Sequence, residues 1–366
     1  MRRSLRLSFV GLLLLTTLAA CGGSKSSSQM QWIEGTVPPG GQTAANPTLA
    51  APTLAPTELA TTSSTATSEP APASTTAAPA PNAALTAAQL QQYKPDELGL
   101  IPVLEYHILT TNDSDNEQFV RPISKFKRDL QWLYDHNFYV ISMHDLINNT
   151  ISAPAGKHPF VITFDDSTTG QFRFLKGSDG SVSVDPKSGV GIMEDFFAKH
   201  PDFGHTAFFA VIATDSFCFD WQGTETDADQ EPYCGHKIRW LLDHGYEIGN
   251  HTVHHVNLQD VTDEKFVSEL GGDFEWAKSK DPRAVPDVLA MPFGMYPDAK
   301  THKQQRTWLR DGFTYNGQDY KIVGTLEVGA NPSVAPDSTD WDPVWIPRIQ
   351  AFDEDAHVSG GGGFDT

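Results

Sequence analysis

The stretch FVITFDDSTTG, residues 160–170, ends an apolar and β-branched run with two adjacent carboxylates, Asp165 and Asp166. Five apolar or β-branched residues in succession predict a buried strand. Carboxylates at the end of such a strand must be solvated, paired with a cation or bound to a metal ion. The rest of the sequence has to decide among these three.

Around this stretch, short apolar strands alternate with amphipathic helices from about Asp96 onward. Strands are predicted at 101–106, 138–142, 160–164, 206–213, 246–248 and 288–293, with final strands near 313, 322 and 344. Helices are predicted after a cap at Ser124, around Met193, through Ile238, from Thr262 and after an opening residue at Asp298. This alternation predicts an α/β fold with a parallel sheet or barrel in one domain.

The composition bounds the function. The 366 residues are 39% hydrophobic and 10% aromatic, which is enough for a substantial core. Lys and Arg total 26 against 46 Asp and Glu, so the formal net charge is −20. No nucleic acid partner is expected for such an acidic chain, and anionic lipid surfaces would repel it.

The amino terminus, MRRSLRLSFVGLLLLTTLAAC, has a basic start, an apolar run and a small-residue exit. These features predict a signal peptide over residues 1–21, too short for a stable membrane span. Its end, LAAC, resembles the lipobox of bacterial lipoproteins, in which Cys21 would be lipidated and become the mature amino terminus. An ordinary signal peptide with a nearby cysteine is the alternative. Both predict export, and the first predicts a lipid anchor on the outer side of the bacterial cell membrane.

Residues 22–95 are mostly Ala, Pro, Thr, Ser and Gly, a composition typical of a disordered tether, although a merely tolerated spacer is an alternative. The folded domain is predicted over 96–357, followed by a Gly-rich flexible tail at 358–366. In an exported chain, Cys218 and Cys234 predict a disulfide rather than a metal or catalytic site.

A second stretch, YEIGNHTVHHVNL at 246–258, places His251 and His255 four residues apart. On a helical turn both imidazoles would lie on one face, as in a metal site, whereas satisfied core or surface histidines are the alternative. Asp165 and Asp166, His251, and the sequence Pro292-Phe293-Gly294 each follow a predicted strand. Because sites in parallel α/β folds form at the carboxyl ends of strands, we expect these three groups to meet.

The order TFDD, HTVHH and Pro-aromatic-Gly, preceded by the strand IPVLEYH, resembles the polysaccharide deacetylases of carbohydrate esterase family 4, the NodB-homology domain. The resemblance runs from about Ile101 to Ile349. It implies a distorted (β/α) barrel with fewer than eight regular strands and a single divalent metal ion. Zn²⁺ is the expected ion, with Co²⁺, Mn²⁺ and Ni²⁺ as alternatives.

The resemblance also implies roles for individual residues. Asp165 would be the general base, and Asp166, His251 and His255 the metal ligands. The N–H group of Phe293 would donate to the oxyanion. The substrate would be an acetylated envelope or extracellular polysaccharide, with N-acetyl groups expected and O-acetyl esters as the alternative. We expect a monomer.

Two positions depart from the family pattern near these residues. Ser167 stands where the family has Gly, and Ala290 stands where it often has an Arg that orients the catalytic Asp. Arg348 is the candidate replacement for that guanidinium, and an ordinary surface ion pair is its alternative.

The family's last motif, a Leu-x-His that supplies the general acid, is not visible. His107, just past the first strand, is the candidate acid, and Glu105 on the same strand face would orient it. His357 in the carboxyl-terminal tail is a second candidate.

Two other functions remain open at this point. One is a non-catalytic glycan-binding lipoprotein that retains the barrel, which Ala290, Ser167 and the missing last motif favour and Asp165 argues against. The other is a 2-His-1-carboxylate Fe(II) oxygenase, for which a mainly β jelly roll and a His-x-acid pair would be expected. The alternating α/β pattern argues against the oxygenase.

Overall fold

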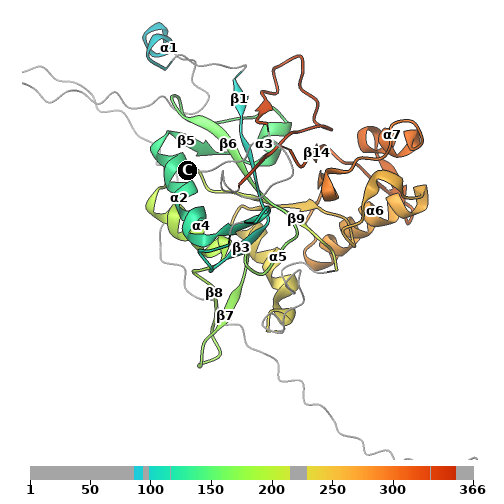
Figure 1. Cartoon of the computed structure of the whole chain (residues 1–366), viewed down its shortest axis with the longest axis horizontal. Helices are drawn as coiled ribbons and strands as arrows, with labels where there is room; N and C mark the ends of the chain where they lie inside the picture. The colour runs from blue at the N-terminus through green and yellow to red at the C-terminus, as the bar shows by residue number, and fades with distance from the viewer. Residues whose placement is uncertain (1–85, 94–98, 116, 215–228, 330, 352–366) are drawn as a thin grey trace, which may run out of the picture. The chain divides into compact units, whose positions relative to one another are not determined.

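The computed structural model describes residues 86–93, 99–115, 117–214, 229–329 and 331–351 (Figure 1). All of them belong to one of the two units into which the chain divides, Ser63–Thr366. Cys21, Cys218, His357 and the predicted tail lie outside the described residues, as do the signal peptide and nearly all of the tether. None of the described helices has the length and apolar character needed to cross a membrane.

An eight-stranded sheet forms the centre of the fold, in the order β14-β11-β10-β9-β6-β2-β16, with β5 also paired to β6. Every pairing within it is parallel. Its strands are β2 (Val103–Tyr106), β5 (Phe138–Val140), β6 (His158–Phe164), β9 (Phe208–Val211), β10 (Glu247–Asn250), β11 (Val288–Ala290), β14 (Gly324–Leu326) and β16 (Ile349–Gln350). The predicted α/β class is confirmed.

The segment 343–351, which contains β16, connects β14 to β2 and so closes the sheet. Ile346 forms a parallel bridge with Leu326 of β14, and the Glu327 N–H donates to the Ile346 carbonyl at 2.9 Å. A few residues later, Ile349 of β16 pairs with Leu104 of β2. The sheet therefore curls into the distorted barrel that was expected.

Helices flank the strands (Figure 1). They are α1 (Ala87–Tyr93), α2 (Ile123–Asp135), α3 (Met143–Ile147), α4 (Gly189–Lys199), α5 (Cys234–Asp243), α6 (Asp263–Lys280) and α7 (Lys303–Asp311), with 3₁₀ turns η2 (Glu231–Tyr233), η3 (Leu258–Asp260) and η4 (Pro292–Gly294). Four two-stranded ribbons complete the described part: β1 (Leu100–Ile101) with β15 (Ser333–Val334), β3 (Ile108–Thr110) with β4 (Val120–Pro122), β7 (Phe174–Lys176) with β8 (Val182–Val184), and β12 (Phe313–Tyr315) with β13 (Gln318–Tyr320).

The predicted helix starts were right once and wrong twice. Thr262 caps α6, its side chain accepting a backbone N–H group. Ser124 lies inside α2 and its hydroxyl donates to Asp113 at 2.6 Å, so it does not cap that helix. Asp298 accepts backbone N–H groups in the turn that precedes α7, which begins only at Lys303.

Side chains along the strands alternate between two cores, as the period of a strand requires. One cluster lines the interior of the barrel and includes Val103, Val161, Phe208, Ala210, Val288, Ala290, Leu326 and Ile346. The alternate positions, such as Leu104, Ile162 and Phe209, pack with α2, α4 and α5. Glu105, Thr163 and Asp165 continue the inward-facing series, so polar groups occupy the carboxyl-terminal end of the interior.

Candidate active site

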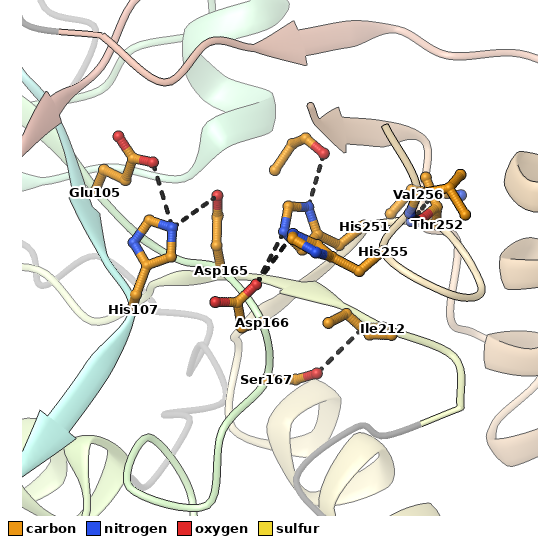
Figure 2. A network of polar contacts seen from close by, with 12 residues as sticks. Glu105, His107, Asp165, Asp166, Ser167, Ile212, His251, Thr252, His255 and Val256 are labelled. Atoms are coloured by element: carbon orange, nitrogen blue, oxygen red, sulfur yellow. Dashed lines mark hydrogen bonds and ion pairs between the residues drawn. The ribbon is translucent and has the colours of Figure 1, made fainter. Parts of the chain in front are cut away.

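The turn after β6 separates the two aspartates. Asp166 and Ser167 both have left-handed backbone conformations, with φ of 71° and 47°. Figure 2 shows Asp165 beside His107, whereas Asp166 points toward two other imidazoles. The Ser167 hydroxyl accepts the Ile212 N–H at 3.1 Å. Serine therefore adopts the conformation for which glycine is favoured, and its buried hydroxyl has a partner.

Asp166, His251 and His255 converge on one point. Asp166 Oδ1 lies 3.3 Å from His251 Nε2 and 3.4 Å from His255 Nε2. Asp166 Oδ1 and His251 Nε2 are buried and have no hydrogen-bond partner among the described residues. Buried polar atoms are normally satisfied, and one carboxylate with two imidazoles is a common ligand set for a divalent transition metal. These residues fit the metal ion that the sequence predicts.

The tautomer of His251 and the pKa of His255 support this fit, although the charges of Asp165 and Asp166 outweigh burial and raise the pKa of His251 above its usual value. His251 Nδ1 lies 2.8 Å from the Ala290 carbonyl oxygen and donates to it, which leaves the lone pair on Nε2 directed at Asp166. Burial, together with the neighbouring His251, lowers the pKa of His255 to about 4. His255 is therefore neutral at neutral pH, the form that binds a metal ion.

The two histidines do not meet on a helical turn, so the geometric reason given for their spacing was wrong. Residues 251–257 form a loop without helix. Thr252 and His255 have positive φ values of 65° and 51°, and the ring centroids of His251 and His255 lie 4.7 Å apart. A loop with two left-handed residues brings the imidazoles together instead.

Arg348 is fully buried and binds Asp165 with two hydrogen bonds. Its Nη1 and Nη2 atoms donate to Asp165 Oδ1 and Oδ2 at 2.7 and 2.6 Å. Nη2 also donates to Glu105 at 3.1 Å, and Nη1 to the Thr163 hydroxyl at 3.2 Å. The exposed fraction of Arg348 is 0%, so the alternative of a surface ion pair is wrong. Because Ala290 has only a methyl group, Arg348 supplies the guanidinium beside Asp165, from a segment near the carboxyl-terminal end of the domain sequence.

The two carboxyl groups on this arginine differ in charge. Burial would raise the pKa of Asp165, but the charge and hydrogen bonds of Arg348 outweigh burial and hold that pKa below its usual range. Burial raises the pKa of Glu105 to about 8, and Arg348 only partly opposes this. At neutral pH Asp165 is therefore the anion, and Glu105 retains a proton.

His107 lies between these two carboxyl groups (Figure 2). Its Nε2 is 3.6 Å from Glu105 Oε1 and 3.9 Å from Asp165 Oδ2. Burial lowers the pKa of His107 below its usual value. Glu105, His107 and Asp165 also have the composition of a metal site, but Arg348 already places a cation on Asp165. The cluster around Asp166 is therefore the better metal site.

Gln171, which was not predicted from the sequence, connects the backbone of His107 to that of Asp165. Its Nε2 donates to the main-chain carbonyls of both His107 and Asp165. A glutamine seven positions beyond a predicted strand carries no sequence signal for this role.

Phe293 lies next to the three predicted metal ligands. Its ring centroid is 4.5 Å from that of His255, and its φ of 58° is left-handed. All seven site residues predicted from the sequence are thus brought to the same end of the barrel: His107, Asp165, Asp166, His251, His255, Phe293 and Arg348.

A cavity of about 410 Å³ opens beside the aspartate turn. Its lining combines apolar, hydroxyl and charged groups, including Leu109, Thr168, Arg173, Asp185 and Lys187. Thr168 and Thr169 follow the aspartate turn in the chain, but none of the predicted site residues is among the lining residues.

Comparison with known proteins gives one family match. Residues 208–310, less than a third of the chain, match the family model described as polysaccharide deacetylase. This segment contains His251, His255 and Phe293 but not the aspartate pair. No curated protein matches the chain significantly.

Several solved structures are similar at low identity. A polysaccharide deacetylase from Bacillus cereus is 15% identical, with a TM-score of 0.47, over 69% of this chain and 65% of that chain. The Streptococcus pyogenes deacetylase PplD, in complex with acetate, is 16% identical with a TM-score of 0.48, over 70% and 93% of the two chains. IcaB from Ammonifex degensii is 14% identical with a TM-score of 0.45, over 69% and 91%. The chain spans less than two thirds of the length of the Bacillus cereus protein.

Proposed function

We propose that this protein is a metal-dependent deacetylase that removes acetyl groups, chiefly N-acetyl groups, from an envelope or extracellular polysaccharide. One observation carries the proposal. Two unpartnered buried atoms, Asp166 Oδ1 and His251 Nε2, face each other beside an aspartate that Arg348 keeps ionised and oriented. The family match of residues 208–310 supports the same reaction class.

Asp166, His251 and His255 would hold the metal. A divalent ion such as Zn²⁺ supplies Lewis acidity toward the acetyl carbonyl and lowers the pKa of water. The Asp165 carboxylate accepts a proton from the water that attacks the acetyl carbon, and Arg348 fixes the direction of its oxygens. The Phe293 N–H donates to the oxygen on which negative charge develops.

His107 completes the reaction as the general acid. His107 Nε2 lies 3.9 Å from Asp165 Oδ2, so the neutral imidazole can take the proton that Asp165 removed from water. As the carbon–nitrogen bond breaks, His107 passes this proton to the sugar nitrogen, and acetate and a free amine are released. Glu105, 3.6 Å from His107 Nε2, orients the ring. With an ester substrate the same steps release an alcohol instead of an amine.

The location of the reaction follows from the amino terminus. We propose a lipid anchor at Cys21 and a flexible tether over residues 22–95, which would let the domain reach polymer outside the cell membrane. Cys234 is disulfide-bonded, which supports an oxidising compartment. Its pairing with Cys218 stays a prediction, because Cys218 lies outside the described residues.

The non-catalytic alternative has lost part of its support. A binding protein has no need of an oriented, ionised base, and Arg348 takes the place that Ala290 leaves without a guanidinium. The parallel α/β barrel also argues against the Fe(II) oxygenase.

Acetate release from a substrate panel tests the proposal. The panel contains N-acetylglucosamine oligomers, peptidoglycan fragments and acetylated xylan, each with added Zn²⁺ or Co²⁺ and with a chelator as control. We expect metal-dependent release from at least one glucosamine-containing substrate. A protein that binds these glycans and the metal yet releases no acetate would support the binding-only alternative.

A further inference from the structure

Helix α6 carries two acidic side chains on the face that packs against the histidine loop, and burial raises the pKa of one of them, Asp273, well above its usual value. Glu269 and Asp273 have exposed fractions of 1% and 0%. Asp273 Oδ2 accepts the His251 N–H at 3.2 Å. Glu269 Oε2 accepts the His254 N–H at 2.9 Å, and Glu269 Oε1 lies 2.9 Å from His254 Nδ1. The two side chains thus bind the backbone at His251 and at His254, the residue that precedes His255.

The loop needs such support because no regular structure holds it. Thr252 and His255 occupy the left-handed region, which is strained for residues other than glycine. Main-chain atoms of α6 contribute as well. The Val253 N–H donates to the Glu269 carbonyl at 3.2 Å, and Asn250 Nδ2 donates to the Leu270 carbonyl at 3.0 Å.

Stability alone does not account for Asp273, whereas Glu269 is also paired with Lys265 at 2.5 Å. A carboxyl group in a fully buried position costs free energy unless all its atoms are paired, and Asp273 Oδ1 has no partner among the described residues. An apolar residue at that position would pack without this cost. Support of the histidine loop better explains an acidic side chain at position 273.

We infer that Glu269 and Asp273 are positioning residues of the metal site. Through the backbone of His251 and His254 they keep the imidazoles of His251 and His255 directed at Asp166. The inference rests on the metal site of the proposed function. Outer groups that orient metal ligands typically change metal affinity by about 10–100-fold when they are removed.

Co²⁺ binding to the full chain tests the inference without any substrate. Glu269→Met removes both acceptor atoms at similar volume, and Glu269→Gln retains one. Glu264→Met is the matched control, because Glu264 is exposed on the same helix. The Co²⁺ dissociation constant and visible absorption spectrum are measured for each, after circular dichroism shows that each variant is folded.

We expect Glu269→Met to weaken Co²⁺ binding about tenfold or more and to change the visible bands. Glu269→Gln should recover most of the affinity, and Glu264→Met should match the wild type. Asp273→Ala removes one of the two acceptors of the His251 N–H, the other being the Val211 carbonyl at 3.0 Å. It should also weaken binding, and it replaces Glu269→Met if that variant does not fold.

Two results would overturn parts of this scheme, and they are distinguishable. Wild-type affinity and spectrum in the folded Glu269 and Asp273 variants would overturn the inference and leave the proposed function standing. A wild-type protein that binds no Co²⁺ would overturn the metal site itself, and the inference with it.

Discussion

Arg348 is the buried cation that pairs with the acidic side chains at the polar end of the barrel. It is bound by Asp165 through two oxygens and by Glu105 through one, and all three side chains are fully buried. Because a planar guanidinium matches a carboxylate in two places, it sets the orientation of Asp165 as well as its charge.

Replacement of Arg348 should therefore affect both stability and activity. Arg348→Met leaves Asp165 and Glu105 buried without a cation, and we expect the free energy of unfolding to fall by about 3–5 kcal/mol. Arg348→Lys keeps a charge but loses the paired hydrogen bonds, so it should be more stable than Arg348→Met and still release acetate slowly. Urea unfolding measures the first effect. An Arg348→Met protein as stable as the wild type would contradict this view of the pair.

His107 is expected to discriminate between leaving groups. An amine leaves poorly without a proton, whereas an alcohol depends less on the acid, so His107→Gln should slow N-acetyl release more than O-acetyl release. The ratio of acetate release from N-acetylglucosamine oligomers and acetylated xylan measures this. His158→Gln, at an exposed position, is the control. An equal loss on both substrates would remove His107 from the acid role.

At the level of elements, His144 connects a helix to two strands at the opposite end of the barrel from the candidate active site. His144 Nδ1 lies 2.6 Å from Glu247 at the start of β10, and its Nε2 lies 2.9 Å from Asp287, just before β11. The hydrogen bonds to these two carboxylates raise the pKa of His144 to about 10. The side chain thus joins α3 to two neighbouring strands as a cation.

This arrangement predicts a pH dependence of stability. The folded-state pKa lies above the ordinary value of 6.5, so the stabilisation is complete below pH 6.5 and is lost as pH rises toward 10. Because the His144 ring is partly exposed, solvent screening makes this stabilisation smaller. The thermal midpoint of the wild type should fall between pH 6.5 and 10 by more than that of His144→Gln. Parallel pH profiles for the two proteins would show that the cluster contributes nothing.

Some elements carried a sequence signal that was overlooked. Glu269 and Asp273 fall on the apolar stripe of α6 formed by Phe266, Leu270 and Phe274. Acidic residues at buried-face positions are unusual and mark groups with a partner. The histidine loop shows the reverse case. The spacing of His251 and His255 predicted that their side chains would meet. The left-handed backbone conformation of Thr252 could not be predicted, because threonine does not favour that conformation.

Across the whole molecule, the alternation of strands and helices was sufficient to predict the parallel α/β sheet. The closure between β14 and β2 was not predictable in detail, because it rests on one bridge at Ile346 and two paired residues, Ile349 and Gln350. Strands this short have no measurable periodicity. The same closure brings Arg348 to Asp165, which explains why sequence reasoning left its role open between two alternatives.

A metal bound only by the folded protein should stabilise the whole domain. At a free Zn²⁺ concentration of 100 times the dissociation constant, the expected gain is about 2.7 kcal/mol. Thermal unfolding with Zn²⁺ and with a chelator should therefore give different midpoints for the wild type and similar midpoints for His255→Ala. Equal midpoints for the wild type would be evidence against a resident metal.

The most direct measurement is acetate release by wild type and Asp165→Asn, with the bound metal of each sample determined at the same time. A base that does not bind the metal predicts wild-type metal content in Asp165→Asn together with a loss of acetate release. Acetate release undiminished in Asp165→Asn would contradict the assignment of this residue as the base, and with it the proposed mechanism.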